Sequence, residues 1–146
     1  MILRESNLML LFIVCVCNHD VAFAAMSEKQ VVAAVRLVRN MCLPKTKALP
    51  EEIDKMHVGD WDIGHNTMCY MQCALNQYKL IGKNNKLDMA QAEQQTKQLP
   101  PSLKAYTDRC LQVCKDSAVT LDDKCVAGYE ISKCMYFCDP EKYFLP

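Results

Sequence analysis

The sequence lacks most features that identify nucleic-acid-binding proteins, serine hydrolases and thioredoxin-like enzymes. Its 17 lysines and arginines are matched by 17 aspartates and glutamates, and neither charge forms a long block, so no basic face for nucleic acid is visible. It contains no Gly-x-Ser-x-Gly nucleophile motif, which argues against that class of hydrolase. It contains no Cys-x-x-Cys pair, which argues against a thioredoxin-like redox role. No Asn-x-Ser/Thr sequence is present, so we expect no N-linked glycan.

Long apolar runs are also scarce, and the clearest one lies at the N-terminus. Arg4 occupies a short polar start, residues 8–17 are apolar, and Ala22-Phe23-Ala24 follows a polar stretch. This order is typical of a secretory signal peptide, and a run of about ten residues is too short to span a bilayer. We predict a signal peptide over 1–24 and a secreted, soluble domain over 25–146. The alternative is a buried N-terminal helix.

Cysteine is abundant, with ten residues in the chain. Removal of the signal peptide would remove two of them, Cys15 and Cys17. Eight remain: Cys42, Cys69, Cys73, Cys110, Cys114, Cys125, Cys134 and Cys138. An even number in a secreted domain predicts four disulfides, although the number alone allows 105 pairings.

The rest of the chain shows little strand-like alternation and predicts an all-α fold of six helices. Ser27 is a suitable cap for the first helix, in which Val31 and Val35 share one stripe. Pro50 and Pro101 suit the first turns of two others, and Gly82 is expected to end the third. The predicted helices cover 27–41, 49–58, 66–81, 87–99, 101–116 and 121–138.

The spacing of the cysteines places them on definite faces of these helices. Residues four apart lie about 40° apart on a helix, so 69/73, 110/114 and 134/138 each share a face. Cys125 and Cys134 are nine apart and lie on opposite faces. The helix over 121–138 must therefore be held from both sides, which makes it the central helix.

The short segment 117–120 makes the last two helices antiparallel neighbours. Cysteine pairs on antiparallel helices join in reverse order, which predicts Cys114–Cys134 and Cys110–Cys138. The parallel alternative, 110–134 with 114–138, would need a long crossover. The helix over 66–81 then supplies the other attachment of the central helix and a link to Cys42.

Six of the cysteines have spacers of 26, 3, 40, 10 and 8 residues, counted from Cys42 through 69, 73, 114 and 125 to Cys134. This pattern resembles the insect odorant-binding proteins, the pheromone- and general odorant-binding family. The resemblance covers nearly all of the mature chain, and the spacers of three and eight are its specific part. It implies Cys42–Cys73, Cys69–Cys125 and Cys114–Cys134. The extra pair, Cys110 and Cys138, departs from the family pattern and is predicted to form a fourth bridge.

The resemblance implies a compact six-helix domain, stapled by disulfides around an apolar pocket. Such a protein reversibly binds small hydrophobic molecules, such as odorants or pheromones, and carries them through extracellular fluid without a cofactor or a chemical reaction. A membrane chemoreceptor is a second candidate partner. Candidate ligand-binding residues are apolar ones on or beside the faces that carry the cysteines, together with one in the apolar tail: Val32, Val35, Met71, Leu75, Leu80, Leu111, Ile131, Met135 and Phe144. For any one of them, ordinary core packing is the alternative.

Three other interpretations remain to be compared with the structure. His65, Cys69 and Cys73 could supply metal ligands, although oxidation of the cysteines is expected instead. His57 and His65, with nearby aspartates, could serve a hydrolase, but the residues beside Cys69 and Cys73 offer no His-Asp pair. A secreted defence or interaction protein could use the same scaffold. The two histidines are also candidates for a loosening of the structure at low pH.

Overall fold

The structure is a computed structural model that describes residues 24–146. The predicted signal peptide, 1–24, lies outside the described residues except for Ala24. Six α-helices and one short 3-10 helix follow: α2 (Glu28–Thr46), α3 (Pro50–Met56), α4 (His65–Gln77), α5 (Met89–Thr96), α6 (Pro101–Cys114), α7 (Lys124–Cys138) and η1 (Pro140–Lys142). Within 24–146, the only β pairing is a single bridge between Ile81 and Leu87. The all-α prediction is confirmed.

Local sequence signals explain where most of the helices begin. The Ser27 side chain accepts a hydrogen bond from the Gln30 backbone, and the Gln30 side chain accepts one from the Ser27 backbone. This reciprocal cap satisfies two otherwise unpaired N–H groups of α2. Asp88 and Asp123 cap α5 and α7 in a similar way. The last helix therefore begins at Lys124, three residues later than predicted.

The largest differences from the predicted helix ends lie in the first and third helices. The first helix continues past Cys42 to Thr46 and contains Pro44, which its last turn tolerates. The third helix ends at Gln77 rather than at Gly82, because Lys79 adopts a left-handed backbone with φ of 56°. The Leu80 N–H then donates to the Leu75 carbonyl at 2.9 Å, which is the hydrogen bond of a Schellman motif. Tyr78 consequently becomes the cap residue of α4.

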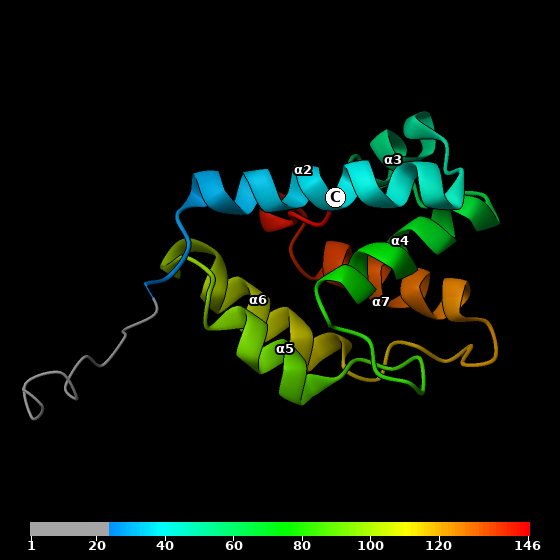
Figure 1. Ribbon diagram of the computed structural model, residues 1–146. Helices are drawn as coiled ribbons and strands as arrows, with labels where there is room; N and C mark the ends of the chain where they lie inside the picture. Colours follow the sequence, from blue (N-terminus) through cyan, green and yellow to red (C-terminus); the bar gives the residue numbers. More distant parts are fainter. Residues whose placement is uncertain (1–23) are drawn as a thin grey trace, which may run out of the picture.

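Helix α7 lies at the centre of the fold (Figure 1). It packs most extensively on α4, while α2 covers α4, α6 packs beside α7, and α5 lies on α6. Within residues 24–146 the cysteines form four disulfides: Cys42–Cys73, Cys69–Cys125, Cys110–Cys138 and Cys114–Cys134. These are the pairs expected from the sequence, and the last two run in the reverse order that antiparallel helices require.

Helices α4 and α7 run in the same direction and come closest at Gly128. A β-carbon on Gly128 would lie 2.6 Å from the Cα of Gln72, well inside van der Waals contact. Three residues earlier on both helices, Cys69 and Cys125 are joined. The absence of a side chain at Gly128 therefore allows the backbones to approach as closely as the disulfide demands.

None of the helices between residues 24 and 146 combines the length and the apolar character needed to cross a bilayer.

We expect Gly128→Ala to destabilise the folded protein by about 1–3 kcal/mol, because the added carbon must push α4 and α7 apart. Urea unfolding with the disulfides intact measures this change. Gly82→Ala is the matched control, since its β-carbon would meet only the end of the Asn84 side chain, at 3.1 Å, and no helix backbone, and its effect should be clearly smaller than that of Gly128→Ala. Equal stability of both variants would show that the approach at Gly128 is not tight.

Candidate functional site

An internal cavity of about 90 Å³ lies between α2, α4, α6, α7 and the C-terminal tail. Its walls are nearly all apolar, and none of the charged side chains between residues 24 and 146 lines it. Apolar cavities of this kind remain dry and accept small apolar molecules. The cavity is therefore the candidate binding site.

Seven of the nine predicted ligand-binding residues line this cavity: Val35, Leu75, Leu80, Leu111, Ile131, Met135 and Phe144. The structure places the other two elsewhere. Val32 is 59% exposed and lines an outer groove. It follows the inward-facing Val31 by one residue, and one residue turns the side chain by about 100° around the axis of α2. Met71 is fully buried in the core and does not reach the cavity. That the seven contact a ligand stays a prediction.

Sequence reasoning missed several residues of the cavity wall. Val31 and Ala34 lie on the same face of α2 as Val35, so the helical period alone could have found them. Tyr78 and Tyr106 also line the cavity. Tyr78 lies seven residues after Met71 and three after Leu75, so the helical period could have found it as well.

The C-terminal tail, residues 140–146, separates the cavity from a larger outer groove. Phe144 and Leu145 line both spaces, and the groove has a volume of about 620 Å³ between α2, α6 and the tail. In Figure 1 the tail returns from the end of α7 to lie against α2. Displacement of these two side chains would join the cavity to the groove.

Aromatic contacts hold the tail in place. The Tyr143 ring lies 5.2 Å from that of Tyr136, 5.6 Å from that of His57 and 6.3 Å from that of Trp61, measured between centroids. Phe144 meets Tyr106 at 6.2 Å. Each such pair contributes about 0.5–1.5 kcal/mol beyond buried area, so together they favour the closed position of the tail.

His57 is a histidine in contact with the tail. Burial, and then the positive charge of Arg39, lower the pKa of His57 below its ordinary value of 6.5, while the Asp54 carboxylate opposes them. Arg39 also forms an ion pair with Asp54 at 3.3 Å. A proton on His57 therefore disfavours the closed arrangement, in which the ring packs against Tyr143.

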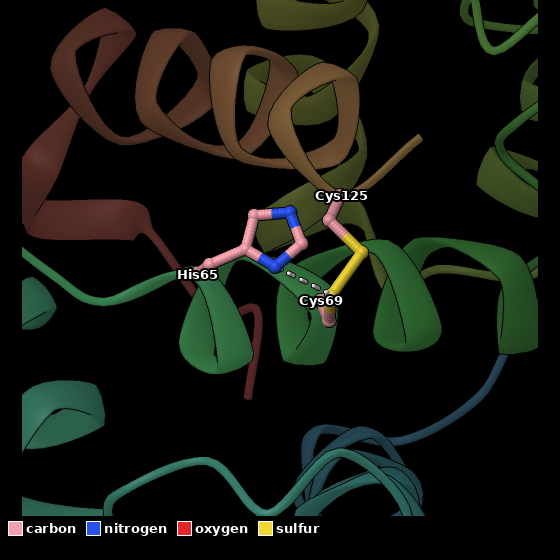
Figure 2. A group of neighbouring side chains, drawn as sticks. All are labelled: His65, Cys69 and Cys125. Atoms are coloured by element: carbon pink, nitrogen blue, oxygen red, sulfur yellow. Dashed lines mark hydrogen bonds between the residues drawn. A yellow bond between two sulfur atoms is a disulfide. The ribbon is translucent and has the colours of Figure 1, made fainter. Parts of the chain in front are cut away.

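His65, Cys69 and Cys125 form a cluster of possible metal ligands at the start of α4 (Figure 2). The His65 Nδ1 lies 3.7 Å from the Cys69 sulfur, but that sulfur is bonded to the sulfur of Cys125. His65 Nε2 is paired with the Asp123 carboxylate at 2.9 Å. Zinc binds thiolates, so the oxidised pair leaves too few ligands for a site. Cys73, the other predicted ligand, is bonded to Cys42.

The histidines and acids considered for a hydrolase are not assembled into a catalytic group. Asp54 pairs with Arg39, and Asp60 lies 3.8 Å from the Lys55 ammonium. His65 pairs with Asp123, which also caps α7 through the N–H groups of Cys125 and Val126. The pairing of His65 with Asp123 joins the starts of α4 and α7, so its role is structural rather than catalytic.

Comparisons with known proteins agree on one family. The family model of the PBP/GOBP family matches residues 24–137. General odorant-binding protein 19a of Drosophila melanogaster is 30% identical over 115 residues, covering 77% of this chain and 79% of the fly protein.

Solved structures have the same fold. Odorant-binding protein 4 of Chrysopa pallens is 41% identical, with a TM-score of 0.78, over 83% of this chain and 99% of that protein. Odorant-binding protein 7 of Anopheles gambiae, which has four disulfide bridges and was solved with an azo compound, is 17% identical with a TM-score of 0.67. It aligns with 80% of this chain over 91% of its own length.

We expect acid to release the tail with a midpoint below pH 6.5. The folded protein binds a proton at His57 more weakly than the released state, so this contribution to stability is present above 6.5 and is lost as the pH falls through the lowered pKa. Trp61, the single tryptophan, contacts Tyr143, and its fluorescence should report the release. His57→Gln should remove or shift the transition, and a chain ending at Asp139 should lack it. An identical profile in His57→Gln would assign the change to another group.

Proposed function

The chain belongs to the PBP/GOBP family, the insect pheromone- and general odorant-binding proteins, and we propose that it is a secreted carrier of small hydrophobic odorants or similar molecules. The family and its fold are those of carriers, not enzymes, so the chain catalyses no reaction. In this proposal residues 1–24 direct secretion, and the mature domain carries its ligand through extracellular fluid to a recipient such as a membrane chemoreceptor.

The apolar cavity is the observation that carries the proposal. An empty space of about 90 Å³ costs about 2 kcal/mol of packing energy at the usual rate per unit volume. The four disulfides each restrict the unfolded chain by about 3 kcal/mol. The stabilisation from the disulfides can therefore offset the cost of the cavity. A domain of this size without disulfides would lose stability if it kept such a cavity.

The size of the cavity limits what it accepts while the tail is closed. A cavity of about 150 Å³ holds benzene, and pockets for larger ligands measure about 300–1,000 Å³. A ligand of odorant size therefore needs Phe144 and Leu145 to move, so that the cavity gains space from the groove beyond. The tail is then both a wall of the site and its entrance.

We expect deletion of residues 140–146 to weaken binding of N-phenyl-1-naphthylamine, an apolar dye that fluoresces out of water, by about tenfold or more. The deletion removes Phe144 and Leu145 from the wall, and each buried side chain of that size contributes about 1.5–3 kcal/mol. Lys142→Gln is the control, because Lys142 is exposed. An unchanged affinity in the truncated chain would exclude the tail as a wall of the site.

We expect Leu111→Trp to abolish saturable dye binding, because the larger side chain would occupy the cavity that Leu111 lines. Val113→Trp lies on the same helix but at a position that is 64% exposed, and it should bind normally. Titration with the dye, followed by its displacement with volatile compounds, measures both variants. Equal displacement from both would place the ligand outside this cavity.

The same titration separates the carrier from a defence or interaction protein. A carrier shows saturable displacement at one site, whereas an interaction protein on this scaffold shows none. Absence of hydrolysis with model esters and lipids would complete the distinction from a hydrolase.

A further inference from the structure

Tyr78 introduces one unusual group into the apolar wall. It caps α4, directly before the left-handed Lys79, and its side chain lines the cavity. Its hydroxyl oxygen is buried and has no hydrogen-bond partner anywhere in residues 24–146. A buried hydroxyl without a partner costs about 1–3 kcal/mol, and buried polar groups in native proteins are nearly always satisfied by protein, water or ligand.

The other polar groups of the wall differ from Tyr78 in having partners. Thr107 donates to the Leu103 carbonyl at 2.8 Å, and Thr96 donates to the Glu93 carbonyl at 3.1 Å. The Tyr106 hydroxyl faces the Met135 carbonyl at 3.5 Å. Gln95, the remaining polar residue of the lining, is half-buried and can bond to water. Among the polar side chains of the lining, the Tyr78 hydroxyl is therefore the buried donor that has no protein partner within residues 24–146.

The surroundings keep this phenol protonated. Burial, and then the neighbouring Tyr70, raise the pKa of Tyr78 well above its ordinary value. Burial also raises the pKa of Tyr143, with Tyr106, Tyr70, Tyr78 and Tyr136 as further causes, which shows that these phenols share one neighbourhood. The hydroxyls of Tyr70 and Tyr143 are likewise buried without a partner in the described chain. Of these three, Tyr78 lines the cavity and Tyr143 the outer groove, whereas Tyr70 lies in the core.

We propose that the cavity selects neutral, mostly apolar molecules that carry one oxygen acceptor, such as a ketone, aldehyde or ester, and that Tyr78 donates a hydrogen bond to this oxygen. The inference rests on the proposed function and adds the chemical class of the ligand. Carboxylates are disfavoured, because no cation lines the cavity among the described residues and an unpaired charge is costly to bury.

A matched pair of ligands and a matched pair of variants test the proposal. Displacement of N-phenyl-1-naphthylamine by 2-octanone and by octane is measured for the wild type, Tyr78→Phe and Tyr129→Phe. Tyr129 is the control, because its hydroxyl donates to the Trp61 carbonyl at 3.1 Å and it is not part of the cavity lining. Tyr78→Phe should lower the affinity for the ketone about three- to tenfold and leave that for octane unchanged, whereas Tyr129→Phe should alter the two equally.

The possible outcomes distinguish this inference from the carrier function. If Tyr78→Phe changes both ligands equally, or octanoate binds as tightly as 2-octanone, the inference is overturned and the carrier remains. If neither ligand displaces the dye and the dye itself does not saturate, the carrier function fails first. The melting temperature without ligand adds a check: Tyr78→Phe should not lower it, and a decrease would show that the hydroxyl already has a protein or water partner.

Discussion

The backbones of α4 and α7 meet at Gly128, where a β-carbon would lie 2.6 Å from the Cα of Gln72. This approach places Cys125 against Cys69 on one side of α7 and leaves its other side free for α6. Cys134 and Cys138 then bond to α6 in reverse order. The cavity lies between this framework and the C-terminal tail.

The tail completes this arrangement in a different way. The last disulfide is at Cys138, the end of α7, so no disulfide holds residues 140–146. They are held by the aromatic rings around Tyr143 and by the burial of Leu145. The ion pair between Arg109 and Asp139, at 2.8 Å, directs the chain back toward α2. Covalent bonds thus fix the helical frame, whereas weak contacts close the site, so the closure can open without unfolding the domain.

Charge is distributed in accordance with these two roles. The cavity wall carries no charged side chain within the described residues, and its phenols are protonated at physiological pH. The outer groove, by contrast, is lined by Arg39, His57, Glu141 and Lys142. Changes in pH therefore act on the rim and the tail, while recognition inside the cavity depends on shape and on neutral hydrogen bonding.

The sequence by itself determined the helical class, the central position of α7 and the order of the bridges between α6 and α7, because the helical period converts cysteine spacing into faces. Family resemblance supplied the bridges to Cys42 and Cys69. The same period predicted which apolar residues face inward, but not which border an empty space. Val32 faces the outer groove because it lies about 100° around α2 from the inward-facing Val31. Met71 lies in the packed core because it is one helical turn away from Leu75, which lines the cavity. Only the tertiary structure decided that the tail forms the partition and that the Tyr78 hydroxyl is buried without a partner, because both depend on contacts between segments distant in the chain.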